Sequence, residues 1–228
     1  MNIYILTEGD QTEMKLYPKW LSYIVPELVQ IESFNKATKN SYYIFSGGGI
    51  PSIYNHAVNA IKDINSIGTY DYLIIALDAE ELSPIRRKEK LLEHLAKESI
   101  ELNKNCKLEI IIHNKCIETW FLGNRKVYKR NPQGERFKIY SKFYNVETSD
   151  PELMGKMDDF YLTAHFHESY LREMLKEHNL RYRKSRPNAV LEKHYFDELL
   201  SRVEDIPEHL QSFSKSIELL RKIKSEIL

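Results

Sequence analysis

Four short runs of apolar residues in the first half of the chain predict buried β-strands. Each run is apolar over most of its length rather than at every second position, which is typical of strands covered on both faces. The runs are residues 2–7, 41–45, 70–77 and 106–113. Between them, the apolar spacing predicts helices over residues 12–25, 51–64, 84–103 and 115–122. Alternating strands and helices indicate an α/β fold, a mostly parallel sheet flanked by helices.

The second half of the chain has no strong strand pattern. Residues 123–150 are rich in Lys, Arg and Tyr and predict a loop-rich connection. Helical spacing then recurs over residues 164–178, 188–203 and 207–227. We therefore expect an α/β domain over residues 1–122, followed by a basic loop and a mainly helical C-terminal region over residues 123–228.

Composition and charge narrow the class of protein only a little. The net charge is zero, but residues 1–120 carry −3 and residues 121–228 carry +3, a mild division into an acidic and a basic half. No apolar stretch is long enough to span a bilayer, and Cys106 and Cys116 are too few for a disulfide framework. Without a signal-peptide pattern, we expect a cytoplasmic protein that does not contact membranes. The oligomeric state is left open.

Acidic residues follow three of the four predicted strands. Glu8 comes directly after the first strand, with Glu13 about one helical turn on, and Asp78 and Glu80 follow the third. Glu118 follows the fourth. Because the carboxyl ends of parallel strands share one edge of the sheet, these carboxylates are expected to converge. Their mutual repulsion favours a bound cation, and oxygen ligands suit Mg²⁺ or Mn²⁺. The alternative is that each acid only caps the helix that follows it.

These motifs resemble the TOPRIM domain. The resemblance rests on Glu8-Gly9-x-x-Thr12-Glu13 after the first strand, on Asp78-x-Glu80 after a later strand, and on the segment "HNKCIETWFL" at 113–122. Together they are most similar to the RloB-like branch, related to the OLD-type nucleases of bacterial phage defence. The resemblance covers residues 1–122 and implies a TOPRIM-like fold, a magnesium-dependent nuclease activity and an ABC-type ATPase as partner.

The resemblance also implies roles for individual residues. Glu8 would act as general acid/base or bridge a metal, Asp78 and Glu80 would bind Mg²⁺ and take part in catalysis, and Glu13 and Glu118 would complete the metal site. Position 80 is Glu where the family usually has Asp. The longer side chain would shift the ion by about one methylene, which bears on activity more than on fold.

The glycines after the second strand allow two interpretations. Gly47, Gly48 and Gly49 precede a helix, so their backbone N–H groups are candidates for contact with a substrate phosphate. The segment lacks the Gly-Lys-Ser/Thr ending of a P-loop. A tight strand-to-helix turn is therefore the favoured interpretation.

Three segments that interleave cations with tyrosine suggest contact with nucleic acid. They span residues 125–130, 136–142 and 181–186 and can neutralise phosphates and stack on bases. The candidate nucleic-acid-binding residues are Arg86, Arg87, Arg125, Lys126, Lys129, Arg130, Arg181, Arg183, Lys184 and Arg186. A solvated basic loop is the alternative for each segment.

Two functions from different classes follow. The first is a Mg²⁺-dependent TOPRIM-type nuclease that cleaves DNA or RNA, including tRNA, as a phage-defence effector restrained by a partner. The second is a catalytically inactive module of the same fold that binds nucleic acid or an ABC-type ATPase. Loss of metal-dependent cleavage on substitution of Glu8 or Asp78 separates the two.

Overall fold

The computed structural model describes residues 1–227, and the chain divides into two compact units. Unit 1 comprises residues 1–77, 84–112 and the residues from Ser216 onward. Unit 2 comprises residues 78–83 and 113–215. Each unit is therefore built from segments that are separate in the sequence, whereas the sequence predicts a single boundary near residue 122.

A five-stranded, all-parallel sheet forms the centre of unit 1, in the order β2-β3-β1-β4-β5. The strands are β1 (Asn2–Thr7), β2 (Val29–Gln30), β3 (Ser41–Ser46), β4 (Tyr72–Asp78) and β5 (Lys107–His113). The last residues of β4 and β5, Asp78 and His113, are counted with unit 2. Strand β1 lies between β3 and β4, with Thr7 opposite both Ser46 and Ala76.

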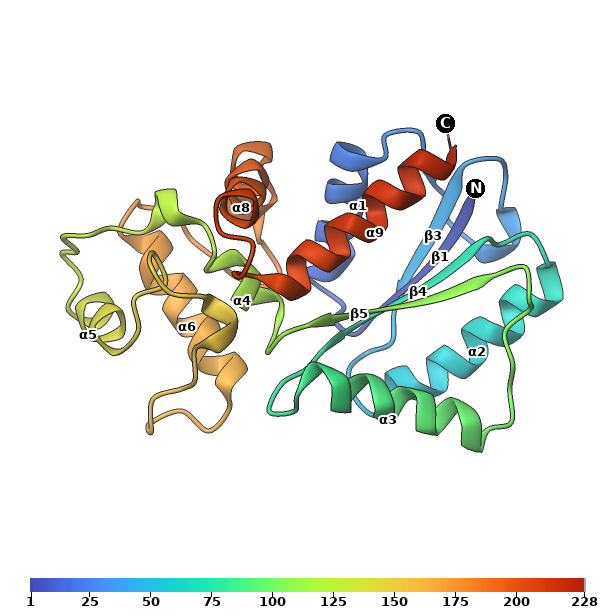
Figure 1. Ribbon diagram of the computed structural model, residues 1–228, viewed down its shortest axis with the longest axis horizontal. Coiled ribbons are helices and arrows are strands. Elements are labelled where there is room, and N and C mark those ends of the chain that lie inside the picture. Colours follow the sequence, from blue (N-terminus) through green and yellow to red (C-terminus); the bar gives the residue numbers. More distant parts are fainter. Residues whose placement is uncertain (228) are drawn as a thin grey trace. The chain divides into compact units, whose positions relative to one another are not determined.

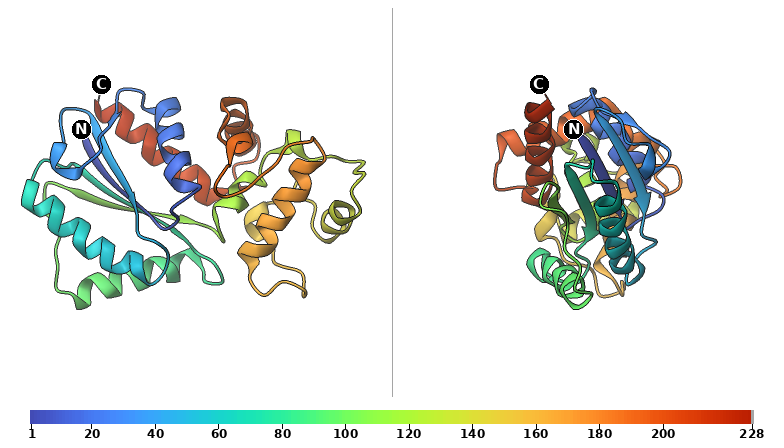
Figure 2. Two further views of the ribbon diagram at one scale, coloured as in Figure 1. Left: turned by 180° about the vertical axis from the view of Figure 1, so that it is seen from behind. Right: turned by 90° about the vertical axis from the view of Figure 1, so that its right-hand side faces the viewer.

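Helices cover both faces of this sheet, as Figure 1 shows and Figure 2 repeats from behind. The helices are α1 (Glu13–Ile24), α2 (Ser52–Ile67), α3 (Pro84–Lys97) and the part of α9 (Gln211–Ile227) that belongs to unit 1. Helices α2 and α3 lie on one face, and α1 and α9 on the other. For α1, α2 and α3 this division follows from right-handed crossovers, because the chain moves one way along the sheet from β1 to β2 and the other way from β3 to β4 and from β4 to β5.

The apolar runs account for the core of unit 1. Helices cover both faces of the central strands, so their apolar side chains are fully buried. Examples are Ile3, Leu6, Leu73 and Ile75, each 0% exposed. Near the end of α9, the carboxylate of Glu226 accepts hydrogen bonds from the Tyr72 hydroxyl (2.9 Å) and from Lys107 Nζ (3.1 Å). These bonds tie α9 to β4 and β5.

Unit 2 is helical and has an aromatic core. Its helices are α4 (Ile117–Phe121), α5 (Glu135–Phe143), α6 (Thr163–Lys176), α7 (Asn188–Leu191), α8 (Lys193–Asp205) and the start of α9. The large buried rings are Trp120, Phe121, Phe137, Phe166, Tyr170, Tyr195, Phe196 and Phe213. The fully buried guanidinium of Arg202 donates to the carbonyls of Gly123, Val146 and Ser149, so one side chain joins the loop after α4 to the loop after α5.

The α/β fold class is confirmed, with three differences in detail. Pro18 was expected to kink or restart the first helix, but α1 runs from Glu13 to Ile24 as one helix with Pro18 inside it. The segment 123–150, predicted as loop, contains α5 and a short 3₁₀ turn, Arg125–Val127. The helix predicted over 188–203 is interrupted, since Glu192 has extended backbone between α7 and α8. Among the described residues, no helix is both long and apolar enough to cross a membrane.

Candidate functional site

Glu8 leaves β1 at the carboxyl edge of the sheet in unit 1. Its N–H group donates to the Ala76 carbonyl of β4 (3.0 Å), and its own carbonyl accepts from the Gly49 N–H (3.0 Å). The residue is 9% exposed. The backbone of Glu8 is therefore held between β4 and the loop after β3, which fixes the direction of its Cα–Cβ bond.

The spacing of Glu8-Gly9-x-x-Thr12-Glu13 has a local structural reason. The Gly9 N–H donates to the carboxylate of Glu13 (3.0 Å), which is the first residue of α1. A Cβ atom at Gly9 would lie 2.2 Å from a Glu13 carboxylate oxygen, so the contact requires glycine. An acid in the first turn also suits the positive end of the helix dipole. Glu13 thus closes the loop after β1.

The glycine loop after β3 uses its backbone N–H groups within unit 1. The Gly47 N–H donates to the Thr7 carbonyl (2.8 Å), and the Gly48 N–H donates to the Ser46 hydroxyl (3.1 Å). Gly48 and Gly49 have φ angles of 68° and 84°, which disfavour residues with a Cβ. These bonds and angles favour the tight turn over a phosphate cradle.

Asp78 and His113, the last residues of β4 and β5, form a pair in unit 2. The Asp78 Oδ1 lies 2.7 Å from the His113 Nδ1, and the imidazole is fully buried while the carboxylate side chain is 17% exposed. The His113 ring also meets the Trp120 ring edge to face, at 4.6 Å between centroids. The buried imidazole therefore holds the Asp78 carboxylate in one orientation, and the sequence analysis did not single out His113.

Glu80 and Glu81 occupy the turn after β4 in different ways. Glu80 has a left-handed backbone (φ 53°), a conformation that favours Gly, Asn or Asp over Glu, and its N–H donates to the Lys115 carbonyl (2.8 Å). Glu81 accepts from the backbone N–H (2.6 Å) and hydroxyl (3.0 Å) of Thr163 at the start of α6. Burial opposes ionisation of Glu81, but these bonds outweigh it and lower its pKa. Glu81 is therefore a cap of α6.

Glu118 is fully buried in α4 and belongs to a network of unit 2. Its Oε1 accepts from the Tyr182 hydroxyl (2.9 Å) and lies 3.5 Å from Lys184 Nζ. Burial alone would lower the pKa of Lys184, but the carboxylates of Glu118 and Glu168 raise it well above its usual value. This arrangement neutralises a buried carboxylate with a lysine ammonium.

The other residues of the segment "HNKCIETWFL" have structural partners. The Asn114 side chain donates to Glu152 (3.2 Å), and the Trp120 indole N–H donates to the Ser212 hydroxyl (2.7 Å). The Thr119 hydroxyl bonds to His167 Nδ1 (2.8 Å), and burial lowers the pKa of His167 to about 4, so this imidazole is neutral. The segment thus organises the core of unit 2 around α4.

Carboxylate oxygens are the ligands that a hard divalent cation prefers. Glu8, Asp78 and Glu80 offer carboxylate oxygens, and an imidazole bound to one oxygen of Asp78 is a common way to orient a ligand carboxylate. Glu13 and Glu118 already accept hydrogen bonds, and each carboxylate has further lone pairs. Among the described residues, Glu118 Oε2 is a buried oxygen without a hydrogen-bond donor.

The basic segment 125–130 is neutralised by acids of unit 2. Its ion pairs join Arg125 to Glu198 and Asp205, Lys126 to Glu198, Lys129 to Glu177 and Arg130 to Glu147. In unit 1, Arg86 pairs with Glu89 (3.1 Å) and Glu93 (2.7 Å) on its own helix. Arg87 is 4% exposed and donates to the Tyr54 hydroxyl (3.3 Å), a buried position that favours a structural role.

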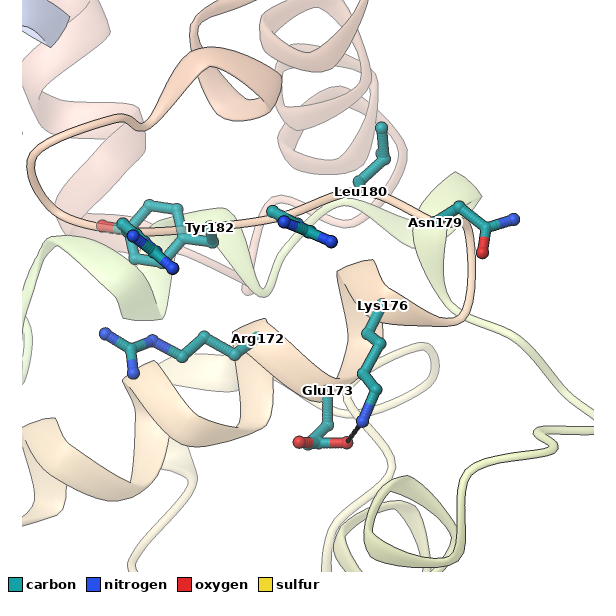
Figure 3. Close-up of a pocket in the computed structure, with 8 residues that line it drawn as sticks. Arg172, Glu173, Lys176, Asn179, Leu180 and Tyr182 are labelled. Atoms are coloured by element: carbon teal, nitrogen blue, oxygen red, sulfur yellow. Dashed lines mark ion pairs between the residues drawn. The ribbon is translucent and has the colours of Figure 1, made fainter.

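The basic segment 181–186 borders a pocket in unit 2 (Figure 3). Arg181 and Arg183 line this pocket, and Tyr182 between them is 4% exposed. Lys184 reaches Glu118, while Arg186 is exposed outside the pocket lining. The two basic segments thus have different surroundings.

The fold and these residues define an α/β protein with carboxylates at the strand ends of its parallel sheet. No protein-family model, curated protein or solved structure matches the chain. The resemblance to TOPRIM nucleases therefore stays a prediction that rests on the motifs and their positions.

Proposed function

We propose that the protein is a Mg²⁺-dependent nuclease of the TOPRIM type that cleaves phosphodiester bonds in DNA or RNA. One observation carries the proposal: β1 and β4 are neighbours, and the Glu8 N–H binds the Ala76 carbonyl. Asp78 follows two residues further along the same strand, so covalent geometry keeps its Cα within about 7 Å of that of Ala76. Two acids leaving adjacent strand ends suit the binding of one cation.

The chain's own residues divide the work in this proposal. Glu8 exchanges a proton with the attacking or leaving oxygen, or contributes a metal ligand. Asp78 and Glu80 hold the cation, and His113 keeps the Asp78 carboxylate in place. Mg²⁺ or Mn²⁺, when bound, supplies positive charge against the negative charge that develops on the phosphate.

The test compares wild type with isosteric variants on single-stranded DNA, double-stranded DNA and total tRNA. Cleavage is followed with Mg²⁺, Mn²⁺ or EDTA for wild type, Glu8→Gln and Asp78→Asn. Asp10→Asn, an exposed acid in the loop that follows Glu8, is the matched control. We expect cleavage by wild type and by the control, and a loss of about 100-fold or more in the two site variants. Circular dichroism checks that each variant is folded.

His113→Asn distinguishes a positioning residue from a catalytic one. Loss of the imidazole should lower the apparent affinity for Mg²⁺ by about 10-fold or more, with partial recovery of cleavage at high Mg²⁺ concentration. Asp78→Asn should show no such recovery. Equal cleavage by wild type and the Glu8→Gln and Asp78→Asn variants would contradict the proposal.

A second candidate, a binding module without catalysis, is favoured by one observation. Glu13 and Glu118 both accept hydrogen bonds inside their own units, so two of the five predicted metal ligands already have a structural role. In this case wild type cleaves none of the substrates with either metal, yet binds nucleic acid or an ABC-type ATPase. Binding is then unaffected by Glu8→Gln and Asp78→Asn.

A further inference from the structure

The pocket that follows α6 is lined mainly by cations. Its volume is about 400 Å³, and all its lining residues come from the end of α6 and the segment after it (Figure 3). They are Arg172, Glu173, Lys176, Asn179, Leu180, Arg181, Tyr182 and Arg183. Four positive charges against one negative charge make this a site for an anion.

The four cations differ in how far they are already neutralised. Arg172 pairs with Glu168 one turn earlier on α6, and Lys176 pairs with Glu173 at 3.6 Å, the contact drawn in Figure 3. Within the described part of the chain, neither Arg181 nor Arg183 forms an ion pair. The net attraction for an anion therefore comes from these two guanidinium groups.

The backbone between the two arginines is anchored. Tyr182 is 4% exposed, and its hydroxyl donates to the fully buried Glu118 at 2.9 Å. Arg181 and Arg183 on either side of it are exposed. The fixed tyrosine limits the positions that the two guanidinium groups can take, which lowers the entropy lost when they bind a shared ligand.

We propose that this pocket binds the terminal phosphomonoester of a nucleic-acid strand, an inference that rests on the proposed function for its substrate class. A terminal phosphate carries about −1.5 to −2 charges at pH 7, whereas an internal phosphodiester carries one. Two guanidinium groups without ion pairs match the terminal group, and each presents paired N–H donors to phosphate oxygens. The pocket therefore recognises a strand end rather than the continuous backbone.

The rest of the lining suits the nucleotide attached to that phosphate. Pockets of about 300–1,000 Å³ hold small molecules, so the volume exceeds the need of a phosphate alone. Leu180, which is 38% exposed, supplies apolar contact, and the Asn179 amide supplies a donor and an acceptor for a base edge. A phosphorylated peptide would use the arginines but has no base edge to pair with the Asn179 amide.

The experiment measures binding in EDTA, so that its outcome does not depend on cleavage. A labelled single-stranded oligonucleotide is prepared with a 5′-phosphate, with a 3′-phosphate or with hydroxyl groups at both ends. We expect wild type to bind one phosphorylated form about ten-fold more tightly than the hydroxyl form. Arg181→Gln and Arg183→Gln should each lose that preference. Arg186→Gln, an exposed arginine of the same segment outside the lining, should keep it.

A variant that should strengthen the preference for phosphate shows that a lost preference in the arginine variants is not caused by misfolding. Glu173→Gln removes the one acid of the lining and releases Lys176, so it should strengthen the preference for phosphate by about two- to five-fold. Equal affinity of wild type for all three oligonucleotides, or a preference that persists in both arginine variants, overturns the inference. Competition by a phosphoserine peptide as strong as by a nucleoside monophosphate overturns the assignment to a nucleotide.

These outcomes are separate from those of the nuclease test. A preference for a terminal phosphate in a protein that never cleaves supports the assignment of the pocket and contradicts the proposed nuclease activity. Cleavage without any end preference supports the nuclease activity and contradicts the assignment of the pocket. Glu8→Gln and Asp78→Asn should leave the end preference unchanged.

Discussion

Two segments of unit 2 carry similar sequences in opposite electrostatic surroundings. Both residues 125–130 and residues 181–186 interleave arginine and lysine with tyrosine. In the first, each cation that the sequence selects has an acidic partner from elsewhere in unit 2. In the second, Arg181 and Arg183 line a pocket and have no ion pair within the described residues.

The difference teaches that a basic run is a candidate for binding only at the cations that the fold leaves without an acidic partner. The acidic partners of the first segment lie between 17 and 80 positions away in the sequence. Ion pairs of this kind hold a connection in place instead of attracting a ligand. We therefore expect the first segment to contribute to stability and the second to binding.

The largest expected effect is on binding by the second segment. Replacing both Arg181 and Arg183 by Gln should reduce the salt dependence of single-stranded nucleic-acid binding, with the slope of log K against log salt falling by about 1.4 for two lost phosphate contacts. Replacing Arg125 and Lys126 by Gln should leave the slope unchanged. Titrations at several salt concentrations measure both. A larger change in this slope for the Arg125 and Lys126 variant would contradict the comparison.

Removing Glu198, an acidic partner of residues 125–130, should make the surroundings of that segment resemble those of residues 181–186. Glu198 is 5% exposed and pairs with both Arg125 and Lys126, so Glu198→Gln should cost about 1–2 kcal/mol of unfolding free energy. The same change should strengthen non-specific nucleic-acid binding by about two-fold. Urea unfolding and nucleic-acid titrations on one preparation measure both effects. A gain in unfolding free energy would contradict the stabilising role assigned to Glu198.

Glu177, the ion-pair partner of Lys129, should make the free energy of unfolding depend on pH. Burial opposes ionisation of Glu177, but hydrogen bonds from the Gln133 and Gly134 backbone N–H groups outweigh it and lower its pKa. Because the folded pKa lies below the unfolded one, this stabilisation is present above the ordinary pKa and disappears as the pH falls through the folded pKa. Glu177→Gln should therefore flatten the fall of unfolding free energy between about pH 5 and pH 3. An unchanged slope would show that other acids dominate there.

The smallest effect is expected at the exposed end of the first segment. The Arg130 side chain is 80% exposed, and its pair with Glu147 is screened by water. Arg130→Gln should change neither the midpoint of thermal unfolding nor the salt dependence of nucleic-acid binding beyond experimental error. A clear loss of binding would place Arg130 with the second segment.

The sheet was predictable because its strands are apolar throughout. Residues 2–7 and 41–45 match β1 and β3, and the later runs match β4 and β5 to within two residues at each end. Helix α5 was not predicted, since it buries only Phe137 and Tyr140 while Ile139 is 54% exposed, which gives a weak periodicity. Strand β2 has two exposed residues and carries no pattern.

Candidate site residues could be predicted from the sequence only where they stand at the end of an apolar strand. Glu8 and Asp78 could be selected because each ends an apolar strand. His113 ends β5 in the same way, and this signal could have identified it as the partner of Asp78. The Tyr182 and Lys184 contacts of Glu118 join residues more than sixty positions apart, and no local pattern encodes such pairs.

The close approach of Gly9 and Glu13 makes substitutions at the two positions interdependent. With Glu13 intact, a methyl group at position 9 would displace the carboxylate from its hydrogen bond, because the two would otherwise be 2.2 Å apart. After Glu13→Asp, the same methyl group would meet a shorter side chain and cost less. The pair should therefore be non-additive in a double-mutant cycle, with replacement of Gly9 costing less after the acid has been shortened. In a diverging lineage, this favours one order of substitutions over the other.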